Sequence, residues 1–79
     1  MGDWKDASIP NGSKLFRSHV FTFMHGGNTF ALEIDEFKDG SFTGHGEHTI
    51  DKSCVIESVS GASIKDCIEK LAQKIESRS

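Results

Sequence analysis

Residues 61–75 constrain the fold of this chain most, because they encode both the start of a helix and its apolar face. Ser63 can accept a hydrogen bond from the amide of Asp66, and the Asp66 carboxylate can accept one from the amide of Ser63. This capping pattern predicts a helix that starts at Ser63. One stripe of the helix is apolar, and it consists of Ile64, Cys67, Ile68, Leu71 and Ile75. A helix with one apolar stripe must lie on an apolar partner.

The preceding residues predict a sheet as that partner. Residues 14–25 and 29–37 are rich in Phe, Val, Thr and Ile, and Gly26-Gly27-Asn28 between them favours a tight hairpin. With a two-residue loop at Gly26-Gly27 or Gly27-Asn28, odd positions of the first strand share a face with even positions of the second. The expected core face then carries Leu15, His19, Phe21, Phe23, Phe30, Leu32 and Ile34.

The same parity argument selects the next turn. A two-residue loop at Asp39-Gly40 would place polar side chains such as Thr43 and Glu47 on the core face. A three-residue loop, residues 38–40 with Gly40 in the left-handed conformation, avoids this. It places another set inward, namely Phe42, Gly44, Gly46, His48 and Ile50. The two glycines then either leave a trough for the helix or loosen the strand.

Residues 52–59 predict a fourth strand, with Cys54 and Ile56 inward, Glu57 outward, and Val55 and Val59 competing for the inward position. The predicted fold is therefore α+β, a four-stranded antiparallel meander with one C-terminal helix packed on one face (β-β-β-β-α). Residues 1–13 hold several helix and strand breakers and are expected to be a flexible N-terminal arm, which Trp4 could anchor. Residues 14–77 are expected to form a single domain.

The composition of the chain argues against several classes of function. The chain has 79 residues with 12 acidic and 9 basic side chains, which argues against non-specific nucleic-acid binding. No apolar run approaches the roughly 18 residues of a membrane span, and residues 1–6 are too acidic to start a signal peptide. We therefore expect a cytoplasmic location and no membrane partner. Cys54 and Cys67 fall at apolar positions, which favours buried free thiols over a disulfide.

Histidines supply the candidate chemistry. The segment Gly44-His45-Gly46-Glu47-His48 resembles a metal site, but on a strand His45 and His48 point to opposite faces. We therefore predict no metal and no cofactor. His19, His45 and His48 remain candidate catalytic residues for the alternative function, a small histidine-dependent enzyme that is RNA-directed or hydrolytic. Glu33, Asp35 and Glu36 are interpreted as the solvated face of the second strand.

A second apolar surface is expected on the sheet face away from the helix. It consists of Phe16, Val20, Met24, Ala31 and Phe37. One helix cannot cover both faces of a sheet, and the outer strands carry unpaired edges. The sequence thus favours a non-enzymatic protein-interaction module that forms a homodimer or binds a protein partner through this face and the edge strands. In the alternative, the arm with Trp4 and Ile9 folds over the same face.

Part of the chain resembles HicB-type antitoxins. The resemblance covers about residues 30–75 and rests on a strand, the Asp39-Gly40 turn and the segment Gly61-Ala62-Ser63-Ile64-Lys65-Asp66-Cys67-Ile68-Glu69. The chain lacks the Pro-Asp-Leu-Pro-Gly segment of that family. The resemblance implies an antitoxin-like domain that binds a protein partner.

Two shorter segments resemble other families. Val55-Ile56-Glu57 leading into the Ser63 helix is similar to dodecins, which have two long strands after the helix. Arg17-Ser18-His19-Val20-Phe21 is similar to the Ser-His strand of HicA-type mRNA-cleaving toxins, and this resemblance implies a catalytic role for His19. The hairpin register instead places His19 inward beside Ile34 or Glu36, where a structural role is expected.

Overall fold

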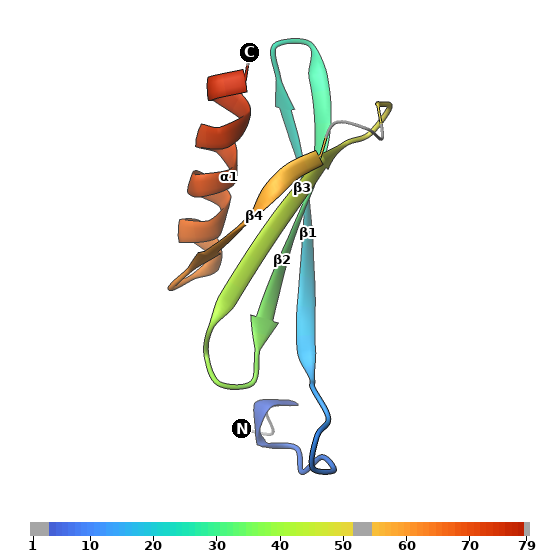
Figure 1. The fold of residues 1–79 in the computed structure, drawn as a ribbon, viewed down its shortest axis with the longest axis vertical. Helices are drawn as coiled ribbons and strands as arrows, with labels where there is room; N and C mark the ends of the chain where they lie inside the picture. Colours follow the sequence, from blue (N-terminus) through green and yellow to red (C-terminus); the bar gives the residue numbers. More distant parts are fainter. Residues whose placement is uncertain (1–3, 52–54, 79) are drawn as a thin grey trace.

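A computed structural model describes residues 4–51 and 55–78 (Figure 1). Its elements are a short 3-10 turn η1 (Trp4–Asp6), strands β1 (Phe16–His25), β2 (Asn28–Phe37), β3 (Phe42–His48) and β4 (Val55–Gly61), and helix α1 (Ile64–Arg78). The strands form one antiparallel sheet in the order β1-β2-β3-β4, and α1 packs on one face of it. This confirms the predicted α+β meander.

The first hairpin turns through two glycines. Gly26 and Gly27 have φ angles of 59° and 81°, as a type I′ turn requires, and His25 pairs directly with Asn28. The ladder then runs without interruption to the pair Phe16 and Phe37. The face that α1 covers, here called the inner face, therefore carries the odd residues of β1 and the even residues of β2, as predicted.

The second turn is the three-residue loop that parity predicted. Gly40 has a φ of 91°, and the amide of Phe37 donates to the carbonyl of Ser41 over 2.9 Å. Gly44 and Gly46 consequently face inward opposite Ile34 and Leu32. The prediction for Ile50 was wrong. The chain leaves the sheet after His48, and the Ile50 side chain is 85% exposed.

β4 contains a bulge that decides which of its apolar residues face the core. Gly46 pairs with Ile56 and Gly44 pairs with Val59, so two residues of β4 oppose the single residue His45. The extra residue shifts the alternation of β4 by one position, so Ile56 and Val59, three residues apart, both point to the core. Val55 is exposed. Cys54, also predicted to point inward, lies outside the described residues.

α1 starts at the predicted cap with one change of partner. The amide of Asp66 donates to the Ser63 hydroxyl over 3.1 Å, and the Asp66 carboxylate accepts from the amide of Ala62, not of Ser63. These bonds satisfy donors at the end of the helix where negative charge is favoured. None of the helices in the described part of the chain is long and apolar enough to span a membrane.

The core lies between α1 and strands β2, β3 and β4. Its buried residues are Phe30, Leu32, Ile34, Ile56, Cys67, Leu71 and Ile75. Gly44 permits the close approach of the helix, because a Cβ there would lie 3.2 Å from Leu71 Cδ1 and 2.8 Å from Ile34 Cδ1. Both inward glycines thus have a packing role. β1 projects beyond this core, and its inward Phe21 stays 38% exposed.

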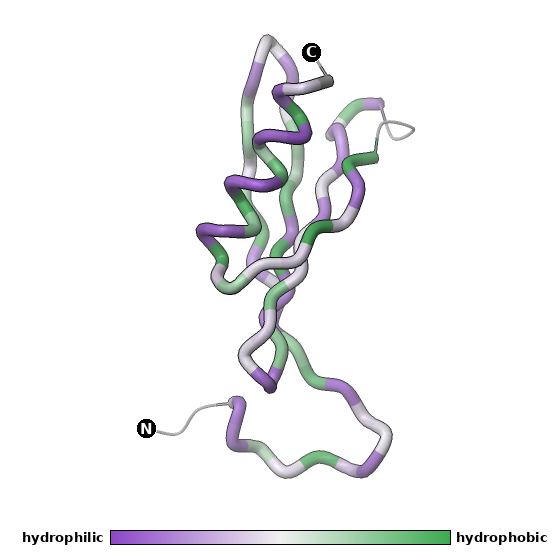
Figure 2. Tube along the Cα trace, turned by 60° about the vertical axis from the view of Figure 1, so that its left-hand side comes forward, coloured by the Kyte–Doolittle hydropathy of each residue, from purple (hydrophilic) through white to green (hydrophobic). Residues whose placement is uncertain are grey.

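The molecule is elongated for its length. Its radius of gyration is 14.4 Å and its extents are 43 × 21 × 19 Å, whereas a compact domain of this length would have a radius of about 12 Å. The N-terminal segment extends from the end of the sheet opposite the C-terminus of α1, as Figure 2 shows together with the alternation of hydropathy along the strands. The sheet therefore has a helix-covered part and an open part.

Candidate functional site

The outer sheet face carries a row of exposed apolar side chains along β1. Phe16, Val20 and Met24 are 45%, 67% and 75% exposed. The Phe16 ring packs against Phe37 of β2 with centroids 5.1 Å apart, and Ala31 lies nearer the sheet centre opposite Thr22. All five predicted interface residues therefore lie on one face, with the most exposed of them on the edge strand.

The described part of the N-terminal arm, residues 4–13, leaves Val20 and Met24 of this row exposed. Lys5 Nζ lies 2.6 Å from Glu36 Oε2, and Lys38 Nζ donates to the Lys5 carbonyl over 2.6 Å. Both contacts hold the arm at the β2–β3 turn, and Glu36 points to the inner face. The alternative in which the arm folds over the outer face is therefore wrong for Val20 and Met24.

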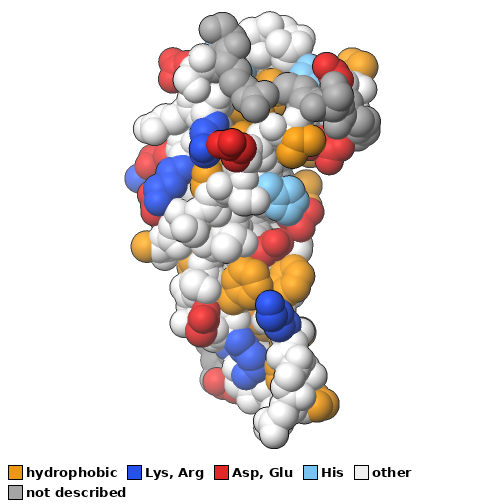
Figure 3. Space-filling view, viewed as in Figure 1, with side chains coloured by type: hydrophobic (Ala, Val, Ile, Leu, Met, Phe, Trp, Pro, Cys, Tyr) orange, Lys and Arg blue, Asp and Glu red, His pale blue; other side chains and the backbone are white. Residues whose placement is uncertain are grey.

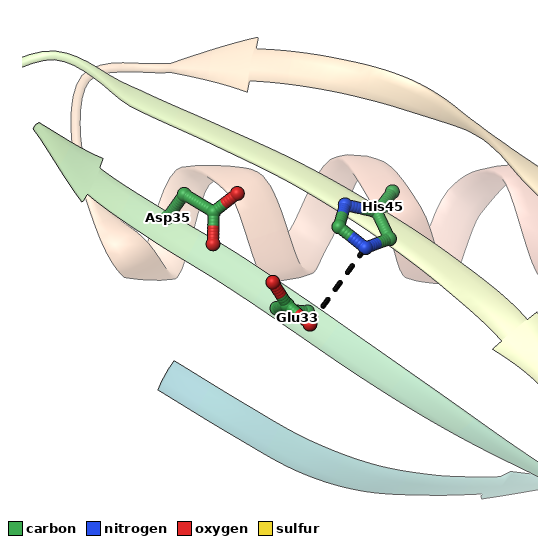
Figure 4. Close-up of side chains that lie close together, drawn as sticks. All are labelled: Glu33, Asp35 and His45. Atoms are coloured by element: carbon green, nitrogen blue, oxygen red, sulfur yellow. Dashed lines mark ion pairs between the residues drawn. The ribbon is translucent and has the colours of Figure 1, made fainter. Parts of the chain in front are cut away.

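A polar cluster lies at the middle of the outer face. Ser18 Oγ is 2.9 Å from Asp35 Oδ1 and 3.3 Å from Glu33 Oε2. His45 Nε2 lies 3.8 Å from Glu33 Oε1, and Figure 4 shows how Glu33, Asp35 and His45 of β2 and β3 lie together. With Ser18, side chains from three strands converge here. Figure 3 shows a histidine, acidic side chains and hydrophobic side chains next to one another on the side of the molecule away from α1.

The cluster has the donor set of a divalent cation site. One ligand atom from each of Glu33, Asp35 and His45 lies within 4.8 Å of the other two. Carboxylate oxygens and an imidazole nitrogen together suit ions such as Zn²⁺. The His45 and Glu33 side chains are 47% and 39% exposed, which leaves the cluster open to solvent.

The cluster could have been found from the sequence, although it was interpreted as a solvated face. The three-residue loop already implies that Glu33 and His45 are cross-strand neighbours, and they do pair. Glu36 was wrongly grouped with Glu33 and Asp35. It lies at an even position of β2, so its carboxylate points to the inner face.

Glu36 instead joins His19 and Lys5. His19 Nε2 lies 3.0 Å from Glu36 Oε1, and Lys5 approaches the other carboxylate oxygen. Hydrogen bonds from Lys5 and then His19 hold the pKa of Glu36 below its usual value. His19 is thus placed beside Ile34 and Glu36 as the hairpin implied, in a contact that ties β1 to the arm.

His48 uses both of its ring nitrogens locally. Its Nδ1 accepts from the amides of Ile50 and Asp51 over 3.1 and 3.0 Å, so its Nε2 donates to Asn28 Oδ1 at 3.2 Å. The ring also meets Phe30 edge-on. His45 and His48 lie on opposite faces as predicted, and the structure does not bring the three candidate histidines together.

Two further features, a buried thiol and an open hollow, add no catalytic candidate. The Cys67 thiol is fully buried, and desolvation raises its pKa, which opposes a nucleophilic role. An open hollow of about 390 Å³ lies between the arm and the β2–β3 turn, with Ile9, Leu15 and Phe37 in its lining. The hollow contains no histidine and so adds nothing to the catalytic candidates.

The two edges of the sheet differ in their protection. β1 pairs with β2 over ten residues without a bulge, and Arg17 is its one permanently charged side chain. On β4, the bulge interrupts the edge, and Lys70 Nζ donates to the Ser60 carbonyl over 2.6 Å. Bulges and charges are the devices that commonly prevent strand addition, so β1 is the more receptive edge.

No protein-family model, curated protein or solved structure matches this chain. The resemblances to HicB-type antitoxins, dodecins and HicA-type toxins therefore stay predictions that rest on the residues quoted for them. The function must be inferred from the geometry of the sheet.

Proposed function

We propose that this chain is a non-enzymatic protein-interaction module that binds a partner through the edge of β1 and the outer sheet face. The observation that carries this proposal is the combination of an uninterrupted ten-residue edge strand with Val20 and Met24 side chains 67% and 75% exposed on it. An edge strand offers backbone hydrogen bonds, and exposed apolar side chains beside it offer area for burial. An antitoxin-like role is one form of this function.

Strand addition explains why both features occur together. A partner strand gains affinity from main-chain hydrogen bonds and specificity from its alternate side chains. Fully burying a valine or methionine contributes about 1.5–3 kcal/mol. The two exposed side chains therefore offer a sizeable gain on binding, before the cost of association is subtracted.

The polar cluster supplies orientation beside the apolar row. Ser18 lies between Phe16 and Val20 on the same face, and its hydroxyl is already directed at Asp35 and Glu33. Acidic groups at the border of an apolar contact disfavour a partner with an acidic side chain at the matching position. The surface thus combines apolar area that a partner can bury with negative charge that repels acidic partners.

The proposal is tested by charge substitution on the two edges. The double variant V20K/M24K places lysines on the β1 row, and V55K is the matched control, because Val55 is 54% exposed on the other edge strand. We measure the mass by light scattering across concentration and quantify the proteins that co-purify from source cells. Loss of self-association or of a specific partner in V20K/M24K, with retention in V55K, is the expected result. If V20K/M24K keeps the mass and partners of the unmodified chain, the proposal is wrong.

A second candidate function is metal-assisted hydrolysis at His45. It is favoured by the proximity of the Glu33, Asp35 and His45 ligand atoms. Calorimetric titration with Zn²⁺ should then show a 1:1 site that H45Q weakens at least tenfold. Hydrolysis of an RNA or ester substrate should also be lost in H45Q, and absence of Zn²⁺ binding would exclude this candidate.

A further inference from the structure

We infer that the partner on the β1 edge is a second copy of this chain, with the two β1 strands paired antiparallel about a two-fold axis at Val20. This inference rests on the proposed function and names its partner. The result is an eight-stranded sheet, four strands from each copy. Symmetric pairing of identical patches is the commonest way in which small domains assemble.

The first step is to identify the backbone groups that β1 presents. His25 and Asn28 flank the two-residue turn and so form a hydrogen-bonded pair, and every second residue of β1 repeats this arrangement. Odd residues of β1 therefore direct their N–H and C=O groups toward β2. Even residues direct theirs outward, and these are Phe16, Ser18, Val20, Thr22 and Met24.

The second step is the register between two copies. An antiparallel pairing that uses the even backbone groups must place even residues opposite even residues. With Val20 opposite its own equivalent, every cross-strand pair on the outer face is matched in chemistry. The pairs are Val20 with Val20, Ser18 with Thr22, and Phe16 with Met24.

The inner face is also compatible with this register. Arg17 of one copy lies opposite Phe23 of the other, which favours a cation–π contact, and His19 lies opposite Phe21. The exposed Phe21, 38% open beside the helix-covered core, gains a neighbour in this way. No acidic side chain is present on β1, so no like-charged carboxylates meet.

Neighbouring registers fit less well. Moving the axis from Val20 to Phe21 brings Ser18 opposite Met24 and Arg17 opposite His25. The first pair places a hydroxyl against a thioether, and the second gives up the contact between Arg17 and Phe23. Moving the axis to His19 brings Ser18 opposite Val20 and Phe16 opposite Thr22, so each of these pairs joins a polar to an apolar side chain. The side-chain order of β1 therefore favours the Val20 axis.

The proposed contact extends over nearly the whole of β1. Nine residues of β1 form a ladder about 30 Å long, with roughly ten backbone hydrogen bonds. The exposed side chains of Phe16, Val20 and Met24 contribute from both copies, so the apolar row doubles. The chain is elongated, and β1 lies outside its core. A second copy paired along β1 would cover this exposed edge.

The test combines mass with a site-specific cross-link. Hydrogen-bonded antiparallel partners have Cα atoms about 5.5 Å apart, within the range that a disulfide bridges. V20C is therefore expected to form a disulfide-linked dimer on mild oxidation, in a C54S background that leaves the buried Cys67 as the other cysteine. T22C in the same background is the matched control, because the two Thr22 residues would lie at least about 13 Å apart.

Each outcome decides the inference. A concentration-dependent dimer by light scattering, with rapid cross-linking of V20C and at least tenfold slower cross-linking of T22C, supports it. A monomer at all concentrations overturns it, and a dimer in which T22C links as fast as V20C overturns the register. If the unmodified chain is a monomer that retains a partner sensitive to V20K/M24K, the proposed function stands and the homodimer does not. If the unmodified chain forms neither a dimer nor a complex with a partner, both are contradicted.

Discussion

The two edges of this sheet show how one small chain treats the same structural problem in opposite ways. β4 has seven residues, a bulge, and a helix lysine, Lys70, on the Ser60 carbonyl. β1 has ten regularly paired residues, and its outer side chains Val20 and Met24 are exposed. An edge without protection invites pairing with another strand. Under the proposed function, α1 and β4 serve stability and β1 serves recognition.

The largest expected difference between the two sides is in the response to truncation. Leu71 of α1 is fully buried, so L71A should lower the free energy of unfolding by about 2–5 kcal/mol, through lost burial and a cavity. V20A on β1 should change it by less than about 0.5 kcal/mol for the monomer. Urea unfolding in dilute solution measures both values. Equal losses in the two variants would contradict the division of roles.

A second test adds a methyl group on the helix-covered side. In G44A the new Cβ would lie 2.8 Å from Ile34 Cδ1 and 3.2 Å from Leu71 Cδ1, so the core must shift. Overpacking of this kind should lower the free energy of unfolding by about 1–3 kcal/mol. T43A, at the neighbouring position on the outer face, is the control for thermal unfolding. A G44A protein as stable as T43A would show that α1 does not need the glycine trough.

A smaller effect is expected at the helix cap. The Ser63 hydroxyl accepts the Asp66 amide, and S63A should therefore lower the free energy of unfolding by about 1 kcal/mol. S58A, an exposed serine on β4, should leave it unchanged. Denaturant melts of the two variants give the comparison, and a neutral S63A would mean that the cap is not needed to hold α1 on the sheet.

The smallest expected effect is the pH dependence of the arm contact beside β1. Lys5 and His19 lower the pKa of Glu36 in the folded chain, so this contact stabilises the fold above the unfolded pKa. Its contribution is lost as the pH falls below about 4.5 and through the lower folded pKa. E36Q should flatten the acid limb of a stability-versus-pH curve, with E57Q as an exposed control. An unchanged acid limb would show that the arm contact adds nothing to stability.

Much of the fold could be predicted from short segments of the sequence. The wrong predictions concern positions that depend on strand pairing or on where the chain leaves the sheet. Gly26-Gly27 and Gly40 have positive φ angles, and these turns set the register of β1, β2 and β3. The bulge in β4 depends on packing of both Ile56 and Val59, so neither turn nor alternation could reveal it. The inward position predicted for Ile50 was wrong because the strand ends at His48, whose Nδ1 accepts hydrogen bonds from the amides of Ile50 and Asp51.

The candidate site also has one part that the sequence predicts and one part that it does not. The apolar row of Phe16, Val20 and Met24 was predicted from alternation alone, because each lies at an even position of one strand. The polar cluster needs cross-strand neighbours from three strands and a side-chain geometry that no single segment contains. The sequence could suggest that Glu33 and His45 are neighbours, but not that Ser18 would link the two carboxylates.

The central claim is that β1 is the edge through which this chain binds. Residue-resolved amide hydrogen exchange tests it most directly, because the even amides of β1 point away from β2. In concentrated solution or with a partner present, the amides of Ser18, Val20 and Thr22 should become at least tenfold better protected than in dilute solution, while the edge of β4 should not change. If these β1 amides exchange at the same rate under all conditions, or if β4 gains the protection instead, the account is contradicted.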